Sequence, residues 1–239
     1  MNKFGKLYIV ATPIGNLEDI TLRALRVLKE VDLILCEDTR VTKKLLDRYE
    51  IQKPLLSYHH HSKLSRVEKI VEHLENGKNL ALVSDAGTPG VSDPGNELIA
   101  NLTPALSLSR RGSEETIEII PIPGASAITT IASVTGINMS RFTFLGFPPH
   151  KKGRMTFVAD IEKSDYPVVI FESKFRIMKL LDELGGLGGF ERIRLVVGRE
   201  LTKIYEEIIR GNIDQVKKHF ENDKQKIAGE FVIVIYKEK

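Results

Sequence analysis

Residues 79–90 read Asn-Leu-Ala-Leu-Val-Ser-Asp-Ala-Gly-Thr-Pro-Gly. The apolar residues from Leu80 to Val83 are typical of a buried strand. Small and turn-forming residues follow at once, together with one carboxylate at Asp85. Because ligands of open parallel sheets bind beyond the carboxyl ends of the strands, this junction predicts where a site would lie in such a sheet.

Three other apolar runs in the first half end in the same way. They cover residues 6–12, 33–36 and 117–120, and they lead into Pro13-Ile14-Gly15-Asn16, Glu37-Asp38-Thr39-Arg40 and Pro121-Ile122-Pro123-Gly124. Helical periodicity is expected between the runs, with helices ending near residues 30, 49, 76 and 102. Strands that alternate with helices predict βαβ units, and hence an N-terminal α/β domain with a parallel sheet.

The second half predicts a different architecture. Strand-like runs lie at 142–145, 168–171, 194–197 and 231–235, and helices are expected over about 152–162, 174–184 and 212–222. This order indicates a mixed-sheet α+β domain. We therefore expect an N-terminal domain over residues 1–121 and a C-terminal domain over residues 122–239. Residues 104–115 have no clear period and are expected to form an exposed loop.

Composition limits the class of protein. The 239 residues include a single cysteine, Cys36, so a disulfide scaffold is excluded. Cys36 lies in an apolar run, which favours a small buried side chain over a reactive thiol. The N-terminal residues lack the pattern of a signal peptide, and no window approaches the roughly 20 apolar residues that span a bilayer. We expect a cytoplasmic protein without a membrane segment.

The formal net charge of +3 is unevenly distributed. Residues 1–120 contain 16 Lys and Arg against 17 Asp and Glu, a net charge of −1. Residues 121–239 contain 19 against 15, a net charge of +4. This balance permits a nucleic-acid partner without requiring one.

Several familiar motifs are absent from the sequence. No GxGxxG follows the first strand, and GxxxxGK[ST], HExxH and GxSxG do not occur, so a Rossmann dinucleotide site and a P-loop are unsupported. His59-His60-His61 suggests a metal, but three adjacent side chains converge on one ion only in irregular backbone. We expect no metal, and instead a polar loop in which His59 touches the substrate.

Each remaining motif has a structural alternative. Asp85 could cap backbone N–H groups in a turn, or it could bind sugar hydroxyls or an ammonium group while Gly87 lets a ligand approach. The small residues of 123–127 could serve tight helix packing or leave room for a ligand. The basic cluster His150-Lys151-Lys152-Gly153-Arg154 could be a solvated loop or a phosphate contact.

In this order, the motifs resemble the ribosomal RNA small subunit methyltransferase I family of the tetrapyrrole methylase superfamily. The resemblance covers nearly the whole chain and rests on seven segments at matching separations: 12–21, 37–40, 84–89, 121–124, 146–149 (Gly-Phe-Pro-Pro), 171–173 (Phe-Glu-Ser) and 199–203 (Arg-Glu-Leu-Thr-Lys). The family usually continues the sixth segment with Pro-His-Arg. This chain has Lys174-Phe175-Arg176 there, which removes any histidine from that position.

The resemblance implies two α/β domains with the cofactor in the interdomain cleft, and a homodimer. It implies methyl transfer from S-adenosylmethionine to the ribose 2′-hydroxyl of a decoding-centre cytidine in small-subunit (16S) ribosomal RNA, either free or within the ribosomal subunit. By motif, the expected cofactor contacts are Pro13, Ile14, Gly15, Ser84, Asp85, Gly87, Thr88, Gly124, Ser126, Ala127, Phe171 and Ala228.

A ribose hydroxyl is a poor nucleophile while it is protonated, so a general base or a nearby cation should assist the reaction. Glu37 or Asp38 could supply the base, and Arg40, Arg199 or Lys203 could hold the oxyanion or a phosphate. A structural ion-pair network between the domains is the alternative for these residues. The expected contacts with substrate RNA are His59, Lys151, Lys152, Arg154, Arg176 and Arg199.

Two other functions stay open from the sequence. A methyltransferase of the same superfamily could act on a precorrin-type or other small molecule, although the polar and basic motifs favour RNA. A non-enzymatic RNA-binding scaffold would need no cofactor pocket.

Overall fold

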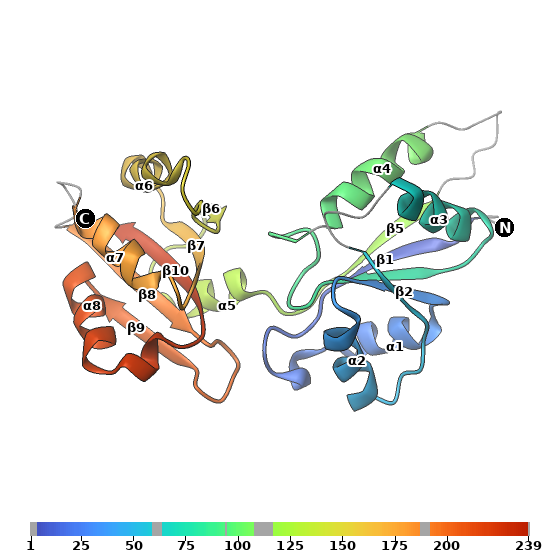
Figure 1. Ribbon diagram of the computed structural model, residues 1–239, viewed down its shortest axis with the longest axis horizontal. Helices are drawn as coiled ribbons and strands as arrows, with labels where there is room; N and C mark the ends of the chain where they lie inside the picture. Colours follow the sequence, from blue (N-terminus) through green and yellow to red (C-terminus); the bar gives the residue numbers. More distant parts are fainter. Residues whose placement is uncertain (1–3, 59–63, 94, 108–116, 187–191, 239) are drawn as a thin grey trace. The chain divides into compact units, whose positions relative to one another are not determined.

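The computed structural model describes residues 4–58, 64–93, 95–107, 117–186 and 192–238. The chain divides into two compact units, unit 1 (Met1–Ser126) and unit 2 (Ala127–Lys239), whose elements are labelled in Figure 1. The division falls five residues beyond the predicted boundary at residue 121. In these described ranges, no helix combines the length and the apolar character that crossing a membrane requires.

Unit 1 is built on a five-stranded parallel sheet in the order β3-β2-β4-β1-β5. Its strands are β1 (Lys6–Val10), β2 (Leu33–Cys36), β3 (Leu55–Ser57), β4 (Leu80–Val83) and β5 (Glu118–Ile122). β5 runs through Pro121, which has no N–H to donate. An edge strand tolerates this residue because one of its sides has no neighbouring strand to bond.

Helices cover both faces of this sheet (Figure 1). They are α1 (Leu22–Glu30), α2 (Thr39–Arg48), α3 (Leu64–Glu75) and α4 (Gly95–Ser107), with a short 3-10 helix η1 (Leu17–Asp19) before α1. Strand side chains alternate between two cores. Ala81 and Val83 pack with α1 and α2, whereas Leu80 and Leu82 pack with α3 and α4.

The order of the strands determines where a ligand can bind. After β1 the chain moves through α1 to β2 and then outward to β3, whereas after β4 it passes β1 to reach β5. The connections that follow the neighbouring strands β1 and β4 therefore leave in opposite directions. This is a topological switch point, the position at which open α/β sheets bind ligands.

Unit 2 has a mixed five-stranded sheet in the order β6-β7-β10-β8-β9, in which only β6 and β7 pair in parallel. Its strands are β6 (Thr143–Gly146), β7 (Val168–Ser173), β8 (Ile193–Arg199), β9 (Glu207–Gly211) and β10 (Glu230–Lys237). Its helices are α5 (Ala127–Val134), α6 (Arg154–Lys163), α7 (Ile177–Gly186), α8 (Ile213–Asn222) and the 3-10 helix η3 (Lys224–Ile227). α6, α7 and α8 share one core against the sheet, and α5 contacts β10.

The structure confirms a parallel α/β unit followed by a mixed-sheet unit, and it corrects three local expectations. β3 and β9 were not predicted, because β3 has three residues and β9 carries Glu207 and Arg210 among its apolar residues. The predicted loop at 104–115 was wrong at its start, since α4 continues to Ser107. The buried side chains of Leu98 and Leu102 hold α4 on the sheet, so a proline inside it does not end the helix. The remainder of that loop lies outside the described residues.

Candidate functional site

The loops that follow β1 and β4 are joined at the switch point. Thr12 and Gly87 exchange two backbone hydrogen bonds, Thr12 N to Gly87 O at 2.9 Å and Gly87 N to Thr12 O at 3.0 Å. The buried Thr12 hydroxyl donates to the Ser84 carbonyl at 3.0 Å. These bonds hold residues 12–15 beside residues 84–88. Thr12 was not among the predicted site residues, and its place between a strand and a proline was the available signal.

The loop after β5 joins the same cluster. Ala11 N donates to Ile122 O at 3.1 Å, and the Thr88 hydroxyl lies 3.5 Å from Ala125 O. Gly124 lies so close to β1 that an added Cβ would be 3.0 Å from Ala11 Cβ. A larger residue there would push the loops apart, so the sequence Pro123-Gly124-Ala125 suits close backbone approach.

The loop after β2 is the fourth member. Asp38 N donates to Asp85 Oδ1 at 3.1 Å, which ties the end of β2 to the loop that follows β4. Gly87 has φ of +79°, and a Cβ there would lie 3.4 Å from Ile14 Cγ2. The loops that follow β1, β2, β4 and β5 thus form one hydrogen-bonded cluster. We call it the loop cluster; its predicted members are Pro13, Ile14, Gly15, Glu37, Asp38, Ser84, Asp85, Gly87, Thr88, Gly124 and Ser126.

Glu37 and Asp38 have opposite electrostatic environments. Burial, together with the negative charges of Asp93 and Asp85, raises the pKa of the Glu37 carboxyl from 4.5 to about 7. Its Oε1 is buried and has no hydrogen-bond partner. Glu37 therefore exchanges a proton near neutral pH, where a general base is most effective. Asp93 was not predicted to influence the site, because its approach to Glu37, which lies far earlier in the chain, is a tertiary contact that sequence spacing does not reveal.

Asp38 is instead committed to its neighbour Arg40. Its carboxylate accepts from Arg40 Nη2 at 2.6 Å and from Arg40 N at 2.8 Å, and it caps the start of α2. These hydrogen bonds, led by that of the side chain, lower the pKa of Asp38 to about 2. Asp38 is therefore a poor proton acceptor, and the Arg40 guanidinium extends into solvent.

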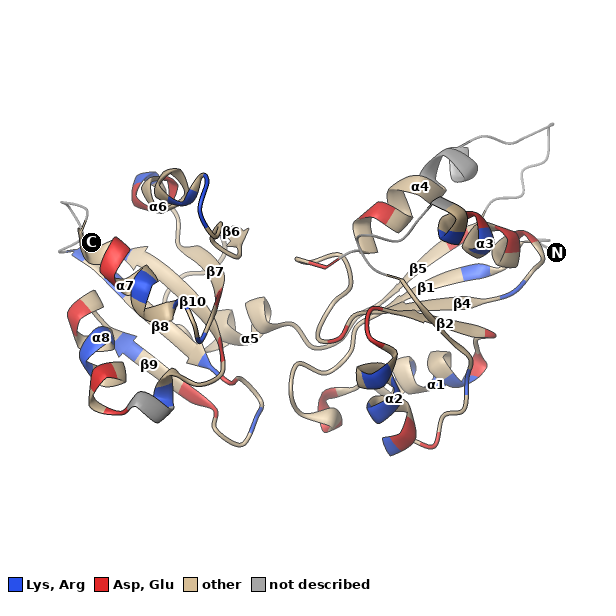
Figure 2. Cartoon of the chain, viewed as in Figure 1, with Lys and Arg blue, Asp and Glu red and all other residues tan. Residues whose placement is uncertain are grey.

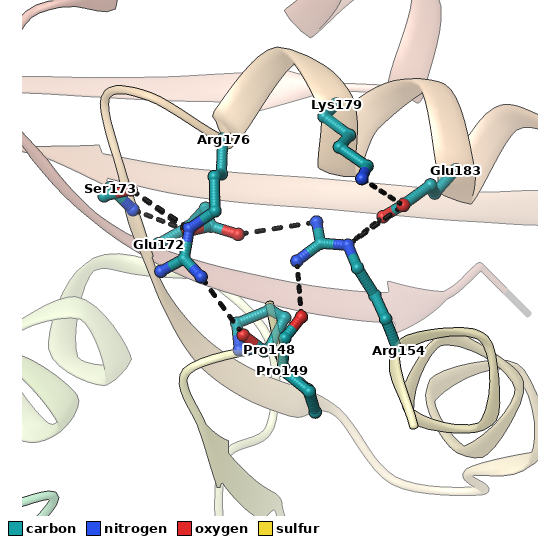
Figure 3. A network of polar contacts seen from close by, with 8 residues as sticks. All are labelled: Pro148, Pro149, Arg154, Glu172, Ser173, Arg176, Lys179 and Glu183. Atoms are coloured by element: carbon teal, nitrogen blue, oxygen red, sulfur yellow. Dashed lines mark hydrogen bonds and ion pairs between the residues drawn. The ribbon is translucent and has the colours of Figure 1, made fainter. Parts of the chain in front are cut away.

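A buried ion network organises unit 2 around Glu172 at the end of β7 (Figure 3). Arg154 lies 2.7 Å from Glu183 and 3.6 Å from Glu172, and Arg176 lies 3.0 Å from Glu172. The two arginines also donate to backbone carbonyls, Arg154 to Pro149 at 3.1 Å and Arg176 to Pro148 at 3.4 Å. Because Arg154 is 4% exposed, we assign it a structural role in place of the predicted RNA contact. Arg176 keeps a partly exposed side chain.

Of the predicted residues, Arg199 ends β8 and Lys203 lies in the turn that follows this strand. Arg199 is buried and donates to the carbonyls of Ala228 and Tyr205, so it also has a structural role. Lys203 Nζ bonds to Glu200 at 3.0 Å and to Glu230 at 2.8 Å. Burial lowers the pKa of Lys203, but these two hydrogen bonds outweigh it and raise the pKa above its ordinary value.

The other predicted residues are not tied to the loop cluster by a described contact. Phe171 packs with Phe144 and Phe147 on unit 2, and Ala228 precedes β10. Lys151 and Lys152 are exposed on the loop that enters α6, which appears blue in Figure 2. His59 lies outside the described residues, which themselves contain no cluster of three or more His, Cys, Asp or Glu suited to a metal. Cys36 is fully buried, as predicted.

Comparison with known proteins agrees with this geometry. The profile of the tetrapyrrole (corrin/porphyrin) methylases matches residues 6–217. Ribosomal RNA small subunit methyltransferase I of Thermotoga maritima is 42% identical over 231 residues, covering 97% of this chain and 98% of that protein. Its counterpart in Bacillus subtilis is 43% identical over 232 residues, covering 97% and 75%. This chain belongs to the ribosomal RNA small subunit methyltransferase I family.

Solved structures show that the fold of this methyltransferase persists across large sequence distances. Cobalt precorrin-4 methyltransferase is similar with a TM-score of 0.65 and 20% identity, covering 97% of this chain and 94% of that one. Diphthine synthase is similar with a TM-score of 0.68 and 15% identity, covering 97% and 90%. The methyltransferase therefore has the tetrapyrrole methylase fold that the sequence motifs implied.

The raised pKa of Glu37 predicts a pH-dependent stability. The folded protein holds this proton more tightly than the unfolded chain, so the stabilisation is complete below pH 4.5 and is lost as the pH rises through 7. We expect Glu37→Gln to match the wild type at pH 4 and to unfold several degrees higher at pH 8. Thermal unfolding at both pH values measures this, and equal midpoints at pH 8 would contradict it.

Removal of Glu172 should destabilise unit 2, because Arg176 would lose its buried counterion and Arg154 would keep only one of its two carboxylate partners. We expect Glu172→Ala to lower the free energy of unfolding by roughly 3 kcal/mol or more. Lys179→Ala is the matched control, since Lys179 is 61% exposed and lies 3.8 Å from Glu183; its effect should be under about 1 kcal/mol. Denaturant titration compares the two, and similar losses in both variants would refute this role for the network.

Proposed function

We propose that this protein transfers a methyl group from S-adenosylmethionine to the ribose 2′-hydroxyl of a cytidine in the decoding centre of small-subunit (16S) ribosomal RNA. The observation that carries the proposal is the loop cluster at the switch point, in a chain that covers 98% of a relative named for ribosomal RNA methylation. The precise nucleotide and the 2′-oxygen rest on the family resemblance.

The chemistry of the loop cluster fits an adenosyl sulfonium. Asp85 is exposed, and its carboxylate has acceptor capacity beyond the bond from Asp38 N, which suits ribose hydroxyls or an ammonium group. Gly87, Gly124 and Ala125 carry little or no side chain where the loops meet, and Ile14 offers an apolar contact for a purine. When bound, S-adenosylmethionine supplies a methyl group already activated by its positive sulfur. Ala127, Phe171 and Ala228 of unit 2 stay predicted contacts.

The chain must then align and deprotonate the hydroxyl nucleophile. Of the two predicted bases, Glu37 suits this role, because its pKa is near 7 and its Oε1 is free of a hydrogen bond. Asp38 suits the orientation of Arg40, whose guanidinium could hold a phosphate. Lys203 is a second candidate cation, since its raised pKa keeps it charged.

We propose that Lys151 and Lys152, which are exposed and take no part in the buried ion network, contact RNA phosphates. Arg176 belongs to that network, but its partly exposed side chain could also contact a phosphate. Phosphate contacts position the RNA but do not read its sequence. We also propose that the protein forms a homodimer, as the resemblance implies, and that it acts in the cytoplasm, where its proposed RNA substrate would lie. A precorrin-type substrate is less supported, because the precorrin methyltransferase is 20% identical and speaks for the fold alone.

The substrate can be identified by mapping methyl groups on ribosomal RNA. Small subunits from cells that lack this protein, incubated with the enzyme and S-adenosylmethionine, should gain one ribose methyl group on a decoding-centre cytidine. Mass spectrometry of nuclease fragments locates it. A methyl group on a base, or methylation of an added precorrin but not of RNA, would contradict the proposal. Absence of any turnover together with tight RNA binding would indicate a scaffold.

Asp85 should dominate cofactor affinity. Charge-assisted hydrogen bonds contribute about 1.5–3 kcal/mol, so Asp85→Ala should weaken S-adenosylmethionine binding at least about tenfold while the protein stays folded. Isothermal titration calorimetry measures the affinity. Asp47→Ala is the matched control, because Asp47 is an exposed carboxylate of the same unit on α2. Equal affinity of Asp85→Ala and the wild type would remove Asp85 from the site.

A further inference from the structure

Two aromatic side chains of unit 2 point into solvent from neighbouring loops. Phe147, between β6 and α6, is 51% exposed, and Phe175, between β7 and α7, is 84% exposed. Figure 3 shows Arg176 donating to the Pro148 carbonyl. Because Pro148 follows Phe147 and Arg176 follows Phe175 in the chain, this bond joins the two loops next to both phenylalanines. An exposed aromatic ring contributes no buried area to the stability of its own domain. Such rings are common at interfaces, where a flat group such as a nucleic-acid base stacks on them.

Positive charge surrounds these rings. Lys151 and Lys152 follow Phe147 on its loop, and Lys174 precedes Phe175 with its Nζ 5.1 Å from the ring centroid. Residues 147–153 and 173–176 contain no Asp or Glu, and the adjacent Glu172 is buried beside two arginines. These two loops therefore combine lysines with rings and carry no acidic group of their own, which suits a polyanion that also carries flat apolar faces.

Aromatic packing and hydrogen bonds support the loops that carry these rings. Phe171 lies under Phe147 with 5.3 Å between ring centroids, and Phe144 contacts Phe171 at 5.0 Å. Arg154 and Arg176 fix the carbonyls of Pro149 and Pro148 from the buried network. A preordered loop loses less conformational entropy when it binds a partner, so this support increases affinity without adding contacts.

We propose that Phe147 and Phe175, with Lys151, Lys152 and Lys174, form a binding surface for an unpaired RNA segment. The rings stack on exposed bases, and the lysines contact the phosphates. Unpaired RNA is favoured over a duplex because the bases of an A-form helix are stacked inside and offer no face to these rings. This inference rests on the proposed function, since it assigns the surface by which the ribosomal RNA substrate is held.

Binding of a fluorescein-labelled RNA tests the proposal. The probe is an unpaired oligonucleotide with the decoding-region sequence, and the same strand annealed to its complement is the duplex probe. Fluorescence anisotropy should show roughly tenfold weaker binding of the unpaired probe for Phe175→Ala, and a larger loss for Phe147→Ala combined with Phe175→Ala. Phe175→Tyr should retain most of the affinity because it keeps the ring.

Two matched controls separate stacking from general surface effects. Tyr166→Ala removes an aromatic ring that is 42% exposed near the opposite end of β7, and Lys163→Gln removes an exposed charge at the end of α6. Both should bind RNA like the wild type. Lys151→Gln with Lys152→Gln should instead reduce the dependence of RNA affinity on salt concentration. Thermal unfolding midpoints verify that every variant is folded.

The outcomes distinguish this inference from the proposed function. Equal RNA affinity of the doubly substituted phenylalanine variant and Tyr166→Ala would overturn the inference while wild-type methylation of ribosomal RNA stood. The inference would also be overturned if Phe147→Ala combined with Phe175→Ala bound both RNA probes normally but failed to methylate assembled subunits. That result would indicate that the two rings contact a ribosomal protein and not RNA. Wild-type protein that neither binds nor methylates ribosomal RNA would overturn the proposed function itself.

Discussion

The paired hydrogen bonds between Thr12 and Gly87 are the constraint on which the candidate site depends. They connect the loops that follow β1 and β4, the two strands from which the chain departs in opposite directions. The turn requires a residue that adopts positive φ, and Gly87 supplies it at +79°. Once these loops are joined, Thr88 reaches Ala125 and Asp85 reaches Asp38 N, so one contact organises four loops.

The local electrostatic environment shifts the pKa values of two adjacent carboxyl groups in opposite directions. Glu37 and Asp38 differ by one position, yet burial leaves Glu37 ready to exchange a proton near pH 7 while Arg40 keeps Asp38 ionised. Environments that move the pKa values of neighbouring groups apart are a common way to assign a base and a fixed charge. In unit 2 the buried charges have a structural role, because Glu172 and Glu183 pair with Arg176 and Arg154, and these arginines bond the loops that carry Phe147 and Phe175.

Sequence patterns predicted the parallel unit, the mixed unit and the four loops, because apolar runs that end in turn residues depend on local chemistry. They could not predict that Arg154 and Arg199 are buried, since the tertiary partners that a buried arginine needs are not visible in the sequence around it. The short strand β3 and the charged strand β9 are stabilised by their neighbours in the sheet and carry little local pattern. Asp93 acts on Glu37 through space, which no spacing in the sequence reveals.

The central claim is that the loop cluster of unit 1 binds the methyl donor as a single site. Hydrogen–deuterium exchange with and without S-adenosylmethionine tests it most directly, because ligand binding slows local opening of the backbone it contacts. The account predicts slower exchange together in residues 12–16, 37–40, 84–90 and 122–126. Unchanged exchange in these four segments at saturating S-adenosylmethionine would contradict it.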